Sequence, residues 1–207
     1  EQVSLTIIFP IGGTGERFIR AGIKTPKPFI ELNGKPLLAH ALESYPKNSV
    51  FLFFVRPEYL TGVASIAKAY NASIFSVGPN TKGPLETILL GSSLTDIHGE
   101  VLFADCDSSL NISELKDAIE LFHTSIADGG ATIRSTDDPD CSYSIKDSEN
   151  WILRTKEKDR YFILEDTDIF SRYSTTGPYW WKDFNTFLEC AVEAKKEGVS
   201  SISPIFN

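Results

Sequence analysis

Short apolar runs alternate with longer amphipathic stretches over the first 130 residues. Apolar runs at residues 5–10, 50–55, 73–77 and 101–104 are bounded by polar residues, glycine or proline, as strands buried in a parallel sheet are. Between them, helical spacing or a capping signal predicts helices at residues 36–44, 58–70, 84–94 and 113–125. A short strand at residues 29–32 precedes an Asn-Gly turn. The alternation predicts an α/β fold whose sheet is covered on both faces.

The pattern changes after Gly130. Extended segments are expected at residues 131–135, 142–146, 151–156 and 172–181, and an amphipathic helix over 184–197 ends at Gly198. We expect this β-rich part to lie over one edge of the first. The absence of repeats and linkers favours one domain over 1–207, with halves at 1–129 and 130–207.

Composition narrows the class of protein. With 42% hydrophobic and 23% charged residues, the 207-residue chain is typical of a folded domain and not of a disordered one. The net charge of −8 argues against a nucleic-acid-coating surface, so any anionic ligand requires a local basic cluster. No apolar run approaches the about 20 residues that span a membrane, and no signal peptide is recognisable, so we expect a cytoplasmic protein without membrane contact. The three cysteines are expected to be reduced and structural.

A glycine-rich turn follows the first strand. It comprises Gly12, Gly13, Thr14 and Gly15, with Arg17 next and Lys27 inside a Pro-Lys-Pro triplet. Glycines let backbone N–H groups approach phosphate oxygens closely, and the two cations supply the positive charge that the rest of the chain lacks. Residues 17–35 hold five basic side chains against one acidic one, which is the local cluster required.

Two common phosphate motifs do not fit this turn. The dinucleotide-binding fingerprint needs glycine where Phe18 stands, and the P-loop needs Gly-Lys-Ser/Thr five residues after a glycine, where Arg17, Phe18 and Arg20 occur. The spacing of the turn therefore argues against nicotinamide enzymes and P-loop NTPases.

Two carboxylates directly follow the strand at 101–104. Asp105 and Asp107 alternate onto one side of the extended chain, and ligands of open α/β sheets bind beyond the carboxyl ends of strands. Carboxylate oxygens suit Mg²⁺ held together with substrate phosphates, so at least one of the pair is predicted to bind Mg²⁺. The alternative is a turn or a helix cap.

Three weaker patterns carry less information. Gly83-Pro84 opens a helix and could offer backbone groups to a base or ribose. Basic residues alternate over 154–160, on a strand that faces either a ligand or solvent. The aromatic run 178–181 forms either core or a pocket wall. His40, His98 and His123 are isolated, so neither a zinc site nor a histidine-based triad is supported.

Together these residues resemble the sugar-phosphate nucleotidylyltransferase (pyrophosphorylase) or NTP-transferase superfamily, which includes cytidylyltransferases of surface-glycan synthesis. The resemblance runs from Ile7 to about Tyr179 and consists, in order, of the segments 12–17, 26–28, 33–36, 81–87, 105–107, 157–158 and 177–179. It implies a Rossmann-like three-layer fold with a mixed, mostly parallel sheet and a small β-rich acceptor-binding part. It also implies transfer of a nucleoside monophosphate from an NTP, with CTP weakly favoured, to a small phosphorylated acceptor.

The resemblance assigns roles by position. Arg17 and Lys27 would be catalytic, and Asp105 or Asp107 would bind Mg²⁺. The implied nucleotide-binding residues are Gly12, Gly13, Thr14, Gly15 and Gly83, and the implied acceptor-binding residues are Tyr143, Glu157, Lys158, Gly177 and Tyr179.

The chain departs from the superfamily pattern in two places. A second metal-binding acid usually lies on a later strand; residues 201–207 resemble the approach to that strand, so we expect a chain truncated before it, whose full activity is in question. The bulky run 178–181 argues for an acceptor smaller than a hexose phosphate, such as a phospho-alcohol or a phospho-amino acid. Capsule or other surface-glycan synthesis is the expected pathway.

Two other functions stay open. A metal-dependent glycosyltransferase also uses an Asp-x-Asp after a strand, but it has no need of the glycine turn with Pro-Lys-Pro. A non-catalytic nucleotide-binding module would account for the missing second acid. The base, the acceptor and the oligomeric state, including a homo-oligomer, are not determined by the sequence.

Overall fold

One mixed sheet forms the centre of the protein. The computed structural model describes residues 5–159 and 173–207. Within them eight strands form this sheet, in the spatial order β5 (Ser73–Ser76), β4 (Val50–Val55), β1 (Thr6–Ile11), β6 (Val101–Phe103), β10 (Tyr173–Trp181), β8 (Ser142–Lys146) and β9 (Ile152–Glu157), with β7 (Gly129–Ser135) paired with β10. The α/β class and the mixed sheet are confirmed.

The sheet has a parallel part and an antiparallel part. Strands β5, β4, β1 and β6 are parallel, whereas β10 is antiparallel to β6, β7 and β8, and β8 and β9 form a hairpin. Along β10, residues 173–174 pair with β8 and residues 179–181 pair with β6. The register with β7 shifts between Thr175 and Tyr179, where Gly177 lies.

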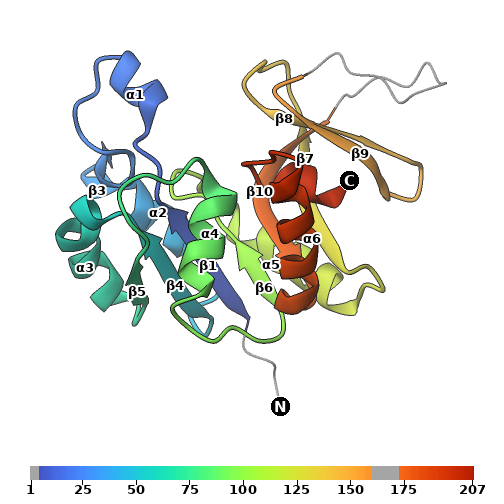
Figure 1. The fold of residues 1–207 in the computed structure, drawn as a ribbon, viewed down its shortest axis with the longest axis horizontal. Helices are drawn as coiled ribbons and strands as arrows, with labels where there is room; N and C mark the ends of the chain where they lie inside the picture. The colour runs from blue at the N-terminus through green and yellow to red at the C-terminus, as the bar shows by residue number, and fades with distance from the viewer. Residues whose placement is uncertain (1–4, 160–172) are drawn as a thin grey trace.

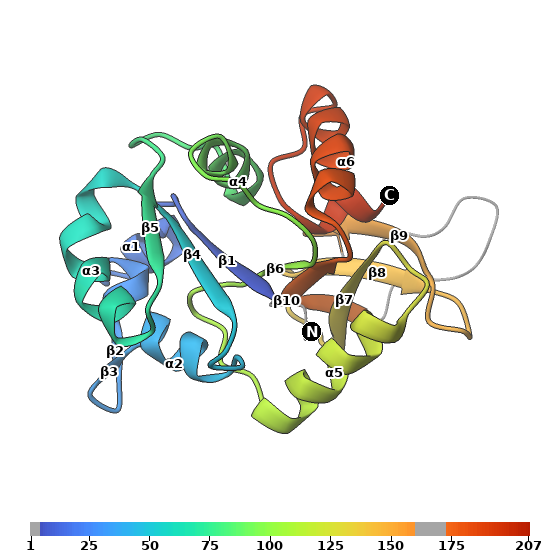
Figure 2. The ribbon, with the colours of Figure 1, turned by 90° about the horizontal axis from the view of Figure 1, so that it is seen from below.

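Helices cover both faces, as Figure 2 shows. On one face lie α2 (Leu37–Glu43), α3 (Leu60–Ala69) and α5 (Ile112–Thr124); on the other lie α4 (Pro84–Ser92) and α6 (Phe184–Lys196). Side chains alternate accordingly, because successive residues of a strand point to opposite faces: Ile7 and Phe9 pack toward α2 and α3, and Ile8 packs toward α4 and α6. Phe9 meets Phe53 edge to face, with ring centroids 5.5 Å apart.

Short elements fill the connections. The turn after β1 leads into α1 (Glu16–Arg20), and η1 (Lys27–Phe29) precedes a small hairpin of β2 (Glu31–Leu32) and β3 (Lys35–Pro36). Two 3-10 helices complete the connections: η2 (Pro57–Tyr59) precedes α3, and η3 (Ser203–Phe206) follows α6. Asn33 and Gly34 have φ of 53° and 73°, which explains the Asn-Gly pair in the hairpin turn.

Several expectations need correction. The β-rich part does not lie over an edge of the first part, because β10 pairs directly with β6 and continues the same sheet. Pro36 belongs to β3, and α2 begins one residue later, at Leu37. Residues 203–206 form η3, in which Ile205 is buried among residues of α4 and α6.

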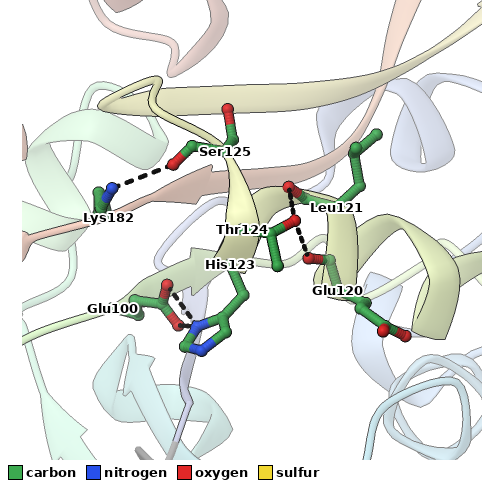
Figure 3. Close-up of polar contacts among 7 residues, drawn as sticks. All are labelled: Glu100, Glu120, Leu121, His123, Thr124, Ser125 and Lys182. Carbon is green, nitrogen blue, oxygen red and sulfur yellow. Dashed lines mark hydrogen bonds and ion pairs between the residues drawn. The ribbon is translucent and has the colours of Figure 1, made fainter.

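Polar contacts hold α5 to the far end of the sheet (Figure 3). His123 Nδ1 lies 3.0 Å from Glu100, which precedes β6, and Lys182 after β10 donates to the Ser125 carbonyl at 3.0 Å. The Thr124 hydroxyl donates to the carbonyls of Glu120 and Leu121. His123 therefore has a structural contact, at the opposite end of β6 from Asp105.

No helix in the described ranges is both long and apolar enough to pass through a bilayer.

Candidate active site

A large cavity opens at the carboxyl ends of the parallel strands. Its volume is about 910 Å³, near the upper end of the roughly 300–1,000 Å³ typical of small-ligand sites. Its walls come from the end of β1, the glycine turn, the start of α4, the loop after β6 and the four antiparallel strands. Figure 1 shows α1 and the β8–β9 hairpin at this end of the molecule, away from the N-terminus. The cavity therefore joins both halves of the chain.

The glycine turn forms one wall through a close contact with the segment before α4. A β-carbon on Gly12 would lie 2.3 Å from Thr87 Oγ1 and 2.5 Å from Thr81 Oγ1, so only glycine fits there. Gly15 has φ of +73° and begins α1, whereas Gly13 faces open space. The threonine pair, whose hydroxyls are 2.9 Å apart, thus holds the turn against α4.

Of the predicted nucleotide-binding residues, the cavity lining includes Gly13, Gly15 and Gly83 but not Gly12 or Thr14. Gly83 has a packing reason of its own. A β-carbon at this position would lie 2.5 Å from the Ser200 carbonyl oxygen, which accepts a hydrogen bond from the Leu85 N–H at 3.1 Å.

Two cations, Arg17 and Lys27, and two carboxylates, Asp105 and Asp107, line the same cavity. Lys27 Nζ lies 2.8 Å from Asp107 Oδ1, and Arg17 lines the cavity without a side-chain partner among the described residues. Burial lowers the pKa of Lys27, but Cys106, Asp107 and Asp105 raise it, and the net direction is upward. Lys27 is therefore charged at neutral pH.

Within this cluster, Asp105 is the carboxyl group whose ionised form is disfavoured. Burial first, and then the charges of Asp107 and Glu157, raise its pKa to about 6, against the lowering effect of Lys27 and Arg17. No described residue donates a hydrogen bond to its side chain, and a β-carbon on Gly177 would lie 2.8 Å from its Oδ2. A carboxylate without donors in such a place is suited to a cation.

The neighbouring thiol is inert. Burial raises the pKa of Cys106 to about 12, so it stays protonated at neutral pH. The cavity offers no activated cysteine nucleophile at this position.

On the acceptor side, Glu157, Lys158 and Tyr179 line the cavity, and Gly177 reaches it through its contact with Asp105. Glu157 accepts a hydrogen bond from Ser142, and the Tyr179 hydroxyl lies 3.1 Å from Thr175 Oγ1. Of the described basic residues over 154–159, only Lys158 lines the cavity; Lys156 pairs with Asp159 at 2.8 Å. Arg160 lies outside the described residues.

The prediction for Tyr143 is wrong. Its side chain is fully buried, and its hydroxyl donates to the Asp138 carbonyl at 2.8 Å. On strand β8 the adjacent Ser142 points to the cavity instead, because neighbouring side chains of a strand face opposite ways. Tyr143 supports the loop that carries Asp138.

The expectation of a bulky aromatic pocket wall is also wrong. Trp180 stacks on Phe122 with ring centroids 5.3 Å apart, and Trp181 stacks on Phe206 at the same separation. Both tryptophans are buried in the core, so Tyr179 alone of residues 178–181 lines the cavity. Because the tryptophans do not line the cavity, their bulk gives no reason to exclude a hexose phosphate as acceptor.

Sequence reasoning missed part of the lining. The missed residues lie in the loop after β6, on α5, on β7, between β7 and β8, and after α6: Ser108, Ser109, Asn111, Glu114, Thr132, Arg134, Asp138, Asp140, Ser201 and Ile202.

Known proteins share this arrangement to different degrees. No protein-family model matches the chain. A 2-C-methyl-D-erythritol 4-phosphate cytidylyltransferase of Leptospira interrogans is 25% identical over 176 residues, which cover 80% of this chain and 73% of that protein. The chain is thus similar in sequence to a cytidylyltransferase of the NTP-transferase superfamily, which agrees with the resemblance of its motifs.

Solved structures agree on the superfamily fold. A nucleoside-diphosphate-sugar pyrophosphorylase of Vibrio cholerae superposes with a TM-score of 0.71 at 23% identity, over 97% of this chain and 86% of that one. A putative glucose-1-phosphate thymidylyltransferase of Bacillus anthracis gives 0.76 at 17% identity, over 98% and 81%. These likenesses establish the fold, and the chemistry of this chain has to be argued from its own residues.

The glycine turn makes a matched pair of variants available. Gly12→Ala forces a methyl group against Thr81 and Thr87, and such overpacking costs about 1–3 kcal/mol. Gly13→Ala meets nothing and should change the melting temperature by about 1 °C or less. Thermal unfolding of both variants measures the difference. Equal melting temperatures would show that the Gly12 contact does not hold the turn.

The pKa of Asp105 gives a second prediction. Because the folded-state pKa of about 6 exceeds the ordinary 3.8, folding favours the protonated form, and stability falls as pH rises between these values. Asp105→Asn should therefore raise the metal-free melting temperature by about 2–8 °C near pH 8. Near pH 3, below both pKa values, the carboxyl is mostly protonated in both states and the gain should nearly vanish. A gain independent of pH in melting curves would contradict a buried ionised carboxylate.

Proposed function

We propose that the protein is a nucleotidyltransferase, which moves a nucleoside monophosphate from an NTP to a small phosphorylated acceptor and releases pyrophosphate. One observation carries the proposal. A single cavity joins a glycine turn with two cations, a buried carboxylate without donors, and a separate set of polar side chains on β8, β9 and β10. Two polyanionic substrates need this combination, and a one-substrate binding site does not.

The glycine turn and its cations would hold the triphosphate. Gly13 and Gly15 line the cavity and could offer their backbone N–H groups, and Arg17 and Lys27 add the charge that an acidic protein must concentrate locally. An oxygen of the acceptor phosphate attacks the α-phosphorus in line, a new P–O bond forms, and the bond to the β-phosphate breaks. Since the nucleophile is already an anion, positioning and charge neutralisation suffice.

Asp105 and Asp107 fit a divalent cation with hard-oxygen preference. Both carboxylates line the cavity, and Asp105 lacks a described donor. The described residues contain no group of three or more His, Cys, Asp or Glu suited to a metal, so phosphate oxygens would complete the ligand set. Bound there, Mg²⁺ would neutralise charge on the α- and β-phosphates. Lys27, which is paired with Asp107 at 2.8 Å, would offer its charge to the phosphates from the same place.

The acceptor would lie against the antiparallel strands. Lys158 and Arg134 offer charge to its phosphate, and Glu157, Thr175, Thr176 and Tyr179 offer hydrogen bonds to hydroxyl groups. This inventory suits a phosphorylated sugar or polyol. The Leptospira relative is named for a cytidylyl transfer to a methylerythritol phosphate, which supports CTP as the first donor to test. A pathway of surface-glycan synthesis fits such an activity.

A thermal-shift panel of CTP, UTP, GTP, ATP and dTTP, each with and without Mg²⁺, tests donor binding. A ligand that binds only the folded state raises the melting temperature, by several degrees at about 100 times its dissociation constant. We expect a shift that requires Mg²⁺ with one triphosphate and is absent in Asp105→Asn. A shift with a nucleotide sugar alone would favour a glycosyltransferase. A triphosphate shift without pyrophosphate release from any acceptor would favour a binding module.

Lys27→Ala should lower turnover about tenfold or more while the protein stays folded, because charge on the leaving pyrophosphate loses its neutralising partner. Lys24→Ala is the matched control, since Lys24 is exposed in the same basic segment and lies outside the cavity. Initial rates of pyrophosphate release measure both variants. Equal rates for Lys27→Ala and the control would remove Lys27 from the mechanism.

A further inference from the structure

At the outer edge of the sheet, one side chain hydrogen-bonds the backbone of the last strand. Strand β9 ends the sheet, so on its outer side no further strand pairs with it in the described part of the chain. Asn207 lies against this edge: its Oδ1 accepts a hydrogen bond from the Thr155 N–H at 2.7 Å, and its Nδ2 donates to the Thr155 carbonyl at 2.9 Å. The amide thus takes both outward backbone groups of one residue, as a neighbouring strand would.

Thr155 is a fixed point of β9. Its side chain is 2% exposed, and its hydroxyl lies 3.0 Å from that of Ser144 across the hairpin. Two and three residues further on, Glu157 and Lys158 line the cavity. Lys158 has φ of 54°, so the chain turns sharply there, and its direction depends on how β9 is held.

The segment that carries Asn207 is itself anchored on the nucleotide side. The Ser200 carbonyl accepts from the Leu85 N–H, next to Gly83, and Ser201 and Ile202 line the cavity. Phe206 stacks on Trp181 with ring planes 8° apart. Residues 200–207 therefore run from the start of α4 to the edge of β9, along one wall of the cavity.

We propose that Asn207 is a positioning residue for the acceptor: by bonding both backbone groups of Thr155, it holds β9 so that Glu157 and Lys158 stand at the cavity. This inference rests on the proposed function. Asn207 does not line the cavity, so it acts through β9 and not by contact with substrate. The glycine turn, Arg17 and Lys27 belong to other elements, so NTP binding should not depend on it.

Steady-state kinetics of Asn207→Ala test the proposal. Glucose 1-phosphate, inositol 1-phosphate and 2-C-methylerythritol 4-phosphate are the acceptor probes, with the donor triphosphate selected by thermal shift. We expect the KM for the acceptor to rise roughly tenfold, with kcat changed about twofold or less and the KM for the triphosphate unchanged. Asn207→Asp keeps an acceptor for the Thr155 N–H but sets an oxygen against the Thr155 carbonyl, so it should not restore the acceptor KM.

The control and a second measurement separate the outcomes. Asn185→Ala makes the same change at an exposed position of α6, where the side chain has no described partner. This variant should behave as wild type. Hydrogen exchange should rise in residues 153–158 of Asn207→Ala and stay unchanged in the glycine turn. Faster exchange with an unchanged acceptor KM, or unchanged exchange, would overturn the positioning role. Wild-type protein that turns over no probe would instead overturn the proposed function on which it rests.

Discussion

Parallel pairing of β1 with β6 is the constraint on which the site depends. The register sets Ile8 opposite Phe103, so the two strands end at the same edge of the sheet. The glycine turn follows one strand and Asp105 follows the other, and parallel strands present such termini together. The glycine turn and the Asp105 carboxylate are thus brought to one edge of the sheet, where Lys27 also contacts Asp107 at 2.8 Å. Antiparallel pairing of β10 with β6 then brings Gly177 and Tyr179 to the same place.

The electrostatics of this edge are unbalanced in the protein alone. Lys27 is bonded to Asp107, whereas Asp105 has a raised pKa and no described donor, and Arg17 has no described partner. A carboxylate without a described donor and a guanidinium without a described partner fit a cation and a phosphate chain that bind together. The chain has a net charge of −8, so these few groups carry the attraction for an anionic substrate against the charge of the whole.

The sequence predicted the parallel half of the fold well because buried strands such as Val50–Val55 are continuous apolar runs. It predicted the glycine turn and Asp105 because both directly follow such strands. It failed where long-range pairing decides. The tryptophans after Tyr179 could be a wall or core until β10 was paired, and Tyr143 could face either side of β8 until its register was known. The amide of Asn207 on Thr155 joins residues far apart in sequence and left no local signal.

The fate of the α-phosphate tests the central claim most directly. Incubation of the protein with Mg²⁺, α-labelled CTP or the triphosphate that binds, and a sugar or polyol phosphate should move the label into a nucleoside diphosphate-linked product. One pyrophosphate should be released for each product formed, and Asp105→Asn should abolish both. Label that stays in the triphosphate with every acceptor, or release of a nucleoside diphosphate from a nucleotide sugar, would contradict nucleotidyl transfer at this site.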